Sequence, residues 1–304
     1  MSSLDEQFLA AGLDPAWVRD LVARSLAEDL GGPDGVDVTS VATIPADQVD
    51  VVDLVARDSG VVAGLSVGLA VFEAAGATDW TVLVADGASV RRGDVLATVT
   101  GPTRALLTAE RTALNLLCRA SGVATHTRSW AEAIEGTGAQ VLDTRKTTPG
   151  LRPLEKYAVR AGGGTNKRMG LYDVAMIKDN HKFAAGSITA AFEAVRATFP
   201  EVPVQVEVDT VAEAVEAVDA GATFLLLDNM EPDLLREVVA AVGAKVELEA
   251  TGGLTLDRAR EFAETGVDYL SVGGLTHSSP ILDIALDLRP RQEGLHGAAH
   301  HRRR

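Results

Sequence analysis

The chain has 304 residues, carries a formal net charge of −15, and is 46% hydrophobic but only 4% aromatic. This length provides a sizeable core for one large or two medium domains, while the negative charge argues against general nucleic-acid binding. Cys118 is the single cysteine, which excludes an internal disulfide bond. No apolar run approaches the roughly 18 residues of a membrane span, and the opening MSSLDEQ lacks a targeting segment. These features predict a soluble cytoplasmic α/β protein that binds neither nucleic acid nor a membrane.

Residues 1–118 predict a small α+β sandwich domain. Asp14 is a favourable N-cap and Pro15 a favourable first helical residue, so the first helix is expected to begin here. The glycine-rich segment 31–35 ends it. The pattern then predicts strands at residues 48–57, 60–64 and 81–85 and a helix at residues 67–75.

The segment DGASVRRGDVLATVTG, which begins at Asp86, resembles the hairpins of lipoyl and biotinyl carrier domains. Those domains carry their cofactor on a lysine at the hairpin tip, and this chain has no lysine before Lys146. A carrier or binding module is therefore an alternative that the missing lysine argues against. The hairpin is expected to be scaffold.

Residues 103–136 predict helical structure that is broken near Ser121-Gly122. Arg111 lies in the first part of this segment, and Leu107 and Leu114 are its neighbours on the same helix face. The arginine stem is therefore expected to lie along an apolar face. Such an arginine is usually a helix-surface cation, so its position alone assigns no function.

From residue 140 the pattern changes to alternating strands and helices, with strand starts about every 20 to 25 residues from residue 204, as in parallel βα units. No GxGxxG motif follows the first strand, so an open, incomplete α/β (TIM-like) barrel is favoured over a dinucleotide-binding sheet. Strands are predicted at residues 140–144, 174–177, 204–208, 223–227, 245–249 and 269–272. Helices are predicted at residues 153–161, 188–199, 211–220, 232–242 and 256–265.

The barrel domain is expected to span residues 119–287, and its last helix is expected to pack back on the N-terminal domain. Residues 288–304 contain few apolar side chains and predict a disordered tail.

A basic segment, residues 142–181, stands out within the acidic chain. Its sequence is LDTRKTTPGLRPLEKYAVRAGGGTNKRMGLYDVAMIKDNH. Basic side chains that converge need a counter-charge, and a polyanionic small molecule is the simplest candidate. The three glycines at residues 162–164 let the backbone approach a ligand or make a tight turn. A solvated charged loop is the alternative, but the coincidence of charge, glycines and apolar strand favours a binding site.

Polar residues follow every predicted barrel strand at its carboxyl end, the face on which barrels place their chemistry. Each residue alone could be a cap or a turn, but six successive strands with polar ends on one rim favour a site. These residues are Arg145 and Lys146, Lys178 to His181, Glu207 and Asp209, Asp228 and Asn229, Thr251 to Gly253, and Gly273 and Gly274.

The rim offers three kinds of chemistry. Its cations can hold carboxylates or phosphates, Glu207 and Asp228 can hold Mg²⁺ together with substrate oxygens, and the paired glycines can present N–H groups to a phosphate. No cysteine or serine–histidine pair offers a nucleophile, and His181 and His277 are expected to be hydrogen-bonding turn residues. The combination suits a phosphorylated substrate and an anionic acceptor. The cations are Arg145, Lys146, Lys167, Arg168 and Lys178.

The basic segment and the motifs MIKDNH, VEVD, LLLDNM, EATGGL and VDYLSVGGLTHS closely resemble the quinolinate phosphoribosyltransferase family. The match extends to EDL…DVTS near the amino terminus and to the AERTALNLL helix. This resemblance implies an N-terminal sandwich domain followed by an open α/β barrel. It also implies formation of nicotinate mononucleotide, diphosphate and CO₂ from quinolinate and phosphoribosyl diphosphate, with Mg²⁺ as cofactor. The enzyme would be a homodimer with shared active sites, or a hexamer built from such dimers.

The resemblance also implies roles for individual residues. Arg145, Arg168 and Lys178 would hold the two quinolinate carboxylates, and Lys146 would contact substrate anions as a catalytic residue. The family usually has histidine at the position of Lys167, so the role of this lysine is open.

Two acids and one distant arginine complete the site that the resemblance implies. Glu207 and Asp228 would act near the ribose and the metal-bound diphosphate, and Arg111 would reach the pocket of the partner subunit. The family usually has serine at Thr251 and alanine at Gly274. The phosphate-binding loops would be formed by Thr251, Gly252, Gly253, Gly273 and Gly274.

Two further alternatives stay open. One is a related phosphoribosyltransferase for another anionic heterocycle, such as a paralogue associated with molybdate uptake. The other is a regulatory anion-binding barrel without turnover. The number of cations available for two carboxylates favours quinolinate.

Overall fold

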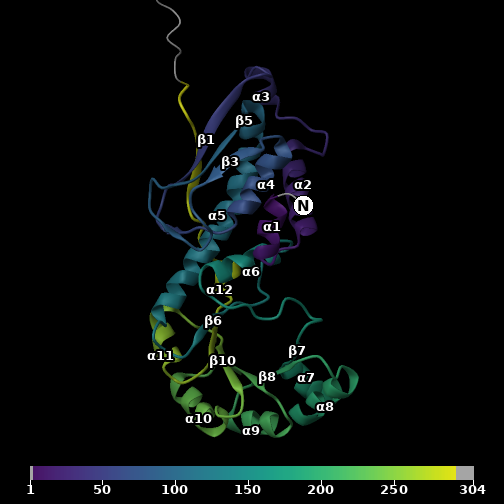
Figure 1. Ribbon diagram of the computed structural model, residues 1–304. Helices are drawn as coiled ribbons and strands as arrows, with labels where there is room; N and C mark the ends of the chain where they lie inside the picture. Colours follow the sequence, from purple (N-terminus) through teal and green to yellow (C-terminus); the bar gives the residue numbers. More distant parts are fainter. Residues whose placement is uncertain (1–2, 292–304) are drawn as a thin grey trace, which may run out of the picture.

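An antiparallel sheet forms the N-terminal domain of the computed structural model, which describes residues 3–291. Its strand order is β12-β1-β5-β3, and a separate two-stranded sheet pairs β2 with β4. Helix α4 packs on α5 beside the larger sheet, and α1 and α2 pack on α4 (Figure 1). The strands are β1 (Val49–Ala56), β2 (Gly60–Val61), β3 (Asp79–Val82), β4 (Ser89–Val90), β5 (Val95–Pro102) and β12 (Ile284–Leu288). The helices are α1 (Ser3–Ala10), α2 (Pro15–Leu30), α3 (Val38–Thr43), α4 (Leu65–Ala75) and α5 (Thr103–Ala133).

The helix that begins at Pro15 is α2, not the first helix as predicted. The predicted cap itself is confirmed, because Asp14 accepts a hydrogen bond from the backbone N–H of Ala16 at 2.9 Å. Helix α1 precedes it and buries Leu4 and Phe8 completely. These two side chains lie four residues apart on one helix face, which attaches this short helix to the domain.

One continuous helix, α5, leads from the N-terminal domain to the parallel sheet (Figure 1). The break predicted near Ser121-Gly122 is wrong. A Cβ atom at Gly122 would lie 2.0 Å from the backbone oxygen of Pro280, so this glycine allows a close backbone approach within an intact helix. Within residues 3–291 no helix, α5 included, is long and apolar enough to cross a membrane.

Six parallel strands form the second sheet, in the order β6-β11-β10-β9-β8-β7. Its edge strands β6 and β7 do not pair with each other within the described residues, which confirms the predicted open, incomplete α/β barrel. Helices α8 to α11 lie outside the sheet (Figure 1). The strands are β6 (Gln140–Leu142), β7 (Ala175–Ile177), β8 (Val204–Val208), β9 (Phe224–Asp228), β10 (Glu247–Thr251) and β11 (Tyr269–Ser271). The helices are α6 (Arg152–Ala161), α7 (Asp179–Ala185), α8 (Ile188–Thr198), α9 (Val211–Asp219), α10 (Pro232–Val242), the 3₁₀ turn η1 (Leu256–Arg258), α11 (Ala259–Ala263) and α12 (Gly274–His277).

The last strand of the described chain returns to the N-terminal domain, whereas the sequence predicts a helix there. Strand β12 pairs antiparallel with β1. Beyond it, Arg289 bonds Asp53 and Arg291 bonds Asp50, each at 2.8 Å. The segment predicted to be disordered from Leu288 is therefore ordered as far as Arg291, and the rest of that prediction, residues 292–304, lies outside the described residues.

Candidate active site

A cavity of about 580 Å³ opens at the carboxyl ends of the parallel strands. Because all six strands run in the same direction, the side chains that follow them meet at this one edge. The cavity brings together most of the predicted site residues. These are Arg145, Lys146, Lys167, Arg168, Lys178, Glu207, Asp228 and Thr251.

Strand register places the acids of the site in rows. Glu207 of β8 is aligned with Leu226 of β9, which is aligned with Glu249 of β10, and all three line the cavity. Asp228 and Thr251 form the next row toward the carboxyl end. Glu249 was not predicted as a site residue, and the signal for it was an acid between apolar residues of β10, Leu248 and Ala250, that are themselves buried.

Glu207 and Asp228 line the cavity from neighbouring strands; Asp228 accepts a hydrogen bond from Asn229 at 2.8 Å, and Glu207 forms an ion pair. The Lys178 ammonium lies 2.7 Å from Glu207 Oε2, so this lysine is held against β8 in the free protein. Burial and the nearby Glu207 carboxylate raise the pKa of Asp228. A cation placed between the two acids would relieve that repulsion.

Lys167 points into the protein and not to solvent. Its ammonium lies 2.5 Å from Glu249 Oε1, and the lysine and glutamate side chains are only 7% and 0% exposed. Burial lowers the pKa of Lys167 and raises the pKa of Glu249, while each charge favours the charge of the other. The predicted cation is thus present in the cavity, with a counter-ion that the sequence did not reveal.

The two arginines of the cavity have fewer partners. Arg145 Nε is buried and has no hydrogen-bond partner among residues 3–291. Arg168 donates to the backbone oxygen of Val174 at 2.9 Å. Burial lowers the pKa of Arg168, and the adjacent Arg145 lowers it further. The two guanidinium groups therefore lie close together and have N–H donors left over. Such a pair can bind an anion.

A buried ion pair supports the loop that carries Lys167 and Arg168. Asp143 Oδ1 accepts from the Lys156 ammonium at 2.5 Å and from the backbone N–H of Lys167 at 2.7 Å. Asn166 donates to Asp143 Oδ2 at 2.7 Å. Asp143 and Lys156 are essentially fully buried, so this part of the basic segment is structural and not a surface for ligands.

The glycine loops flank the cavity without lining it. Gly252 has φ +88°, and a Cβ atom there would lie 2.2 Å from Asn229 Oδ1. A Cβ atom at Gly273 would lie 2.9 Å from Lys146 Cδ. Gly253 and Gly274 follow directly, so both loops pass close to side chains that do line the cavity, Asn229 and Lys146.

Arg111 does not line the cavity of its own chain. It is exposed on α5, and the neighbouring Leu114 is buried in the core of the same chain. The two rim histidines form hydrogen bonds as predicted, but they lie in the short helices α7 and α12 and not in turns. His181 Nδ1 accepts from the backbone N–H of Lys178 at 3.0 Å, and His277 Nδ1 lies 2.5 Å from Ser278 Oγ.

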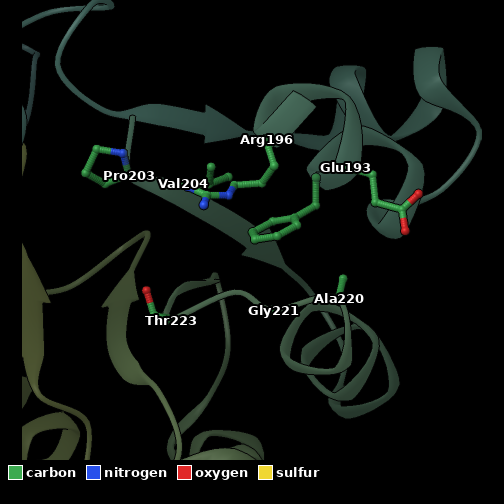
Figure 2. A pocket seen from close by; sticks show the side chains of 8 residues that line it. Glu193, Arg196, Pro203, Val204, Ala220, Gly221 and Thr223 are labelled. Carbon is green, nitrogen blue, oxygen red and sulfur yellow. The ribbon is translucent and has the colours of Figure 1, made fainter. Parts of the chain in front are cut away.

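A second cavity, of about 510 Å³, lies at the amino ends of β8 and β9 (Figure 2). Arg196 of α8 extends toward Val204, whereas Glu193 points away from it (Figure 2). None of the predicted site residues lines this cavity. It lies at the end of the sheet where barrels do not place their chemistry, so the carboxyl-end cavity is the candidate site.

Known proteins resemble this chain over nearly all of its length. Two family sequence profiles match it, described as the N-terminal and C-terminal domains of quinolinate phosphoribosyl transferase, over residues 37–121 and 123–287. The nicotinate-nucleotide pyrophosphorylase (carboxylating) of Mycobacterium leprae is 49% identical over 276 residues, covering 89% of this chain and 96% of that protein.

Solved structures show the same similarity. NadC from Streptococcus pyogenes has 37% sequence identity and a TM-score of 0.87, with 91% of this chain and 98% of that chain covered. The nicotinate-nucleotide pyrophosphorylase from Francisella tularensis has 34% identity and a TM-score of 0.86, with 90% and 96% covered.

Proposed function

Because the chain belongs to the quinolinate phosphoribosyl transferase family, we propose that it transfers a phosphoribosyl group from phosphoribosyl diphosphate to quinolinate. The reaction releases diphosphate and CO₂ and forms nicotinate mononucleotide, a step in the de novo synthesis of NAD. The observation that carries this proposal is the pair of incompletely bonded guanidinium groups, Arg145 and Arg168, in a cavity that also contains carboxylates and is flanked by the two glycine loops.

Quinolinate would occupy the cationic side of the cavity. Its two carboxylates need two or more charged donors, and Arg145 and Arg168 can each supply a bidentate fork. Lys167 and Lys178 keep N–H donors after bonding Glu249 and Glu207. A monocarboxylate would leave part of this set unpaired and desolvated, at a cost of roughly 1–3 kcal/mol for each group.

The chemistry then requires no protein nucleophile. The pyridine nitrogen attacks C1 of the ribose as diphosphate leaves, and positive charge develops on the sugar. Glu207 and Asp228 lie where carboxylates can stabilise that charge. Once the ring nitrogen is quaternary, the electrons left by departing CO₂ are stabilised by the adjacent positive charge, so the 2-carboxylate is the one that leaves.

Glu207 and Asp228 fit a Mg²⁺ that arrives with the diphosphate. Mg²⁺ takes one or two protein carboxylates and completes its shell with water and substrate oxygens, and the raised pKa of Asp228 marks a place where a cation is favourable. Residues 3–291 contain no cluster of three or more acids, histidines or cysteines suited to a resident metal. The metal would polarise the leaving diphosphate.

The phosphates would lie between the two glycine loops and Lys146. Gly252, Gly253, Gly273 and Gly274 have no side chain that would keep a phosphate away from the backbone N–H groups, and Lys146, which lies close to Gly273, adds a charge. Thr251 places a hydroxyl in the same cavity.

The direct test is a turnover assay with purified protein, phosphoribosyl diphosphate and Mg²⁺, following CO₂ and diphosphate. We expect turnover of quinolinate and at least about 100-fold lower kcat/KM for nicotinate, which corresponds to about 2.7 kcal/mol. Equal turnover of the two acids would contradict the assignment of the cations to two carboxylates.

We further propose a homodimer in which the partner's Arg111 completes each site. Arg111 is exposed and remote from its own cavity. Large apolar side chains on the segment before β7 and on α7 are also exposed: Leu171 by 72%, Tyr172 by 76% and Phe183 by 90%. An apolar surface of this kind needs a partner, and an isologous dimer would cover it and bring α5 over the cavity of the other subunit.

Subunit mixing tests the shared site. Arg111→Ala and Lys178→Ala homodimers should each be nearly inactive. In a heterodimer of the two, one pocket carries both substitutions and the other carries neither, so activity should return to about half that of wild type. Verified subunit exchange with no recovery would show that Arg111 acts in its own subunit.

A further inference from the structure

The most deeply buried charged contact of the cavity joins Lys167 to Glu249. The two groups lie 2.5 Å apart with at most 7% of either side chain exposed. Glu249 Oε2 has no hydrogen-bond partner among residues 3–291. The Lys167 ammonium is thus the main group that offsets the burial of the Glu249 carboxylate, with smaller contributions from Ser271 and Lys178.

The backbone of Lys167 is fixed as firmly as its side chain. Its N–H donates to Asp143 at 2.7 Å, and its carbonyl oxygen accepts from the Lys156 ammonium at 3.0 Å. A lysine has three N–H donors. With one used by Glu249, two remain for an anion in the cavity, where Arg145 and Arg168 also lie.

Among the charged groups around Lys167, Glu249 is the one that stabilises the positive charge of the ammonium group. Burial lowers the pKa of Lys167, Glu249 raises it, and the adjacent cations Arg168 and Lys178 lower it again. Asp143 and Lys156 form hydrogen bonds with the backbone of Lys167, and the charges of these two residues offset each other. Ser271 on the neighbouring strand β11 and Lys178 after β7 favour the ionised form of Glu249 in addition to Lys167.

We propose that Glu249 is a positioning residue that fixes the Lys167 ammonium for a substrate carboxylate and keeps dicarboxylate binding insensitive to pH near neutrality. Glu249 acts through Lys167 and does not touch the substrate. The identity of the dicarboxylate rests on the proposed function, whereas the contact is a property of the free protein. A glutamine at position 249 would preserve shape but leave a buried ammonium beside two cations, and this ammonium would release its proton as pH rises.

The test measures the affinity of full-length dimeric protein for phthalate, which carries two adjacent carboxylates but no ring nitrogen and therefore cannot react. In Glu249→Gln, phthalate affinity should fall as pH rises from about 6 to 8, with a slope approaching tenfold per pH unit for one linked proton. In wild type it should change by less than about twofold over the same range. With quinolinate, KM should show the same pH dependence while kcat changes far less.

Two further variants control the experiment. Glu247→Gln makes the same substitution two residues earlier on β10, at an exposed position outside the cavity, and should match wild type. Lys167→Met with Glu249→Gln removes both charges, a change that buried ion pairs tolerate better than loss of one partner. This double variant should bind phthalate more weakly but without the pH dependence of the single variant.

The outcomes are distinct. A Glu249→Gln profile that coincides with wild type would overturn the proposal. If circular dichroism shows that Glu249→Gln is unfolded, the double variant decides the matter: pH-independent weaker binding supports the proposal, and a pH-dependent loss of phthalate affinity overturns it. Absent quinolinate turnover by wild type would refute the proposed function, while the phthalate measurements would still judge the role of Glu249.

Discussion

The two ends of the parallel sheet are built from the same strands but carry opposite kinds of surface. The carboxyl-end cavity, of about 580 Å³, is lined by five cations and three carboxylates. The amino-end cavity, of about 510 Å³ (Figure 2), is lined by one arginine, one glutamate and otherwise uncharged residues. Cavity size therefore does not distinguish the two ends.

The two cavities differ in whether the buried polar side-chain atoms that line them have hydrogen-bond partners. At the carboxyl end, Arg145 Nε and Glu249 Oε2 are buried without a partner in the described chain, which costs folding free energy that a ligand or water must offset. At the amino end, Arg196 donates to the backbone oxygen of Pro200 at 2.5 Å, and no described residue lining that cavity has a buried side-chain atom without a partner. The third such atom in the described chain, Gln205 Oε1, lies on β8 beside Val204 but lines neither cavity, so of the two cavities only the carboxyl-end one contains buried groups that a ligand could satisfy.

The largest expected effect comes from Asp228→Asn at the carboxyl end. Loss of a charge that acts on the transition state should lower kcat/KM for quinolinate by about 10²–10³-fold, or roughly 2.7–4 kcal/mol. Steady-state assays at saturating and limiting Mg²⁺ measure this. Activity that is unchanged at limiting Mg²⁺ would remove Asp228 from the site.

The same variant should not be less stable than wild type. The folded-state pKa of Asp228 is raised above its unfolded value, so the ionised carboxylate is disfavoured by folding at neutral pH. Stability should therefore be equal or higher in Asp228→Asn at pH 7, and the difference should vanish below the unfolded pKa of about 4. Chemical denaturation at several pH values checks the sign.

Arg145→Ala should have the next largest effect among the substitutions that test the difference between the two cavities. A charged hydrogen bond to a carboxylate contributes about 1.5–3 kcal/mol, so the quinolinate KM should rise by roughly 10–150-fold. The fold should persist, because Arg145 Nε makes no hydrogen bond that would be lost. A quinolinate KM within twofold of wild type would mean that the partly bonded guanidinium is not prepared for a carboxylate.

Lys167→His should produce a smaller, pH-dependent effect. A lysine paired with Glu249 stays charged near neutrality, whereas a histidine titrates around pH 6.5. The variant should show a quinolinate KM that increases between about pH 6 and 8, while the wild-type value changes less. Coincident profiles would exclude Lys167 from carboxylate binding.

The smallest effect is expected for Arg196→Ala in the amino-end cavity. Arg196 is exposed and donates to the Pro200 carbonyl, so its loss should change stability by no more than about 1 kcal/mol, and kcat and KM should stay within about twofold of wild type. A large loss of activity would show that the amino-end cavity takes part in function, which would contradict the assignment of function to the carboxyl end alone.

Residues at strand ends were predictable from the sequence because each parallel strand is a short apolar run that ends in polar residues. Asp228 ends the run FLLLD, Glu207 is the second-last residue of VQVEV, and both were located in this way. Glu249 was missed although it ends the predicted strand 245–249; the observed strand continues to Thr251, and the register with Leu226 places Glu249 in the cavity. The bond between Lys178 and Glu207 was not predicted, because the two residues are 29 positions apart in the sequence.

Long-range packing explains the other errors. Gly122 resembles a helix break when only its sequence neighbours are considered. A glycine is needed at this position because the backbone of Pro280 passes close to it. Strand β12 could not be assigned from local pattern because its partner is β1, as the contact between Arg57 and Asp287, 230 residues apart in the sequence, illustrates.

The pairing of β12 with β1 makes the barrel an insertion within the smaller domain, since both ends of the described chain contribute to one antiparallel sheet. During synthesis, the barrel strands leave the ribosome before β12 exists, so β1 remains an open sheet edge until the end. The barrel is then free to fold first, and closure of the small domain comes last. The segments that match the N-terminal and C-terminal family domains meet within α5. Cutting the chain there would leave an N-terminal fragment without β12, the strand that completes its sheet.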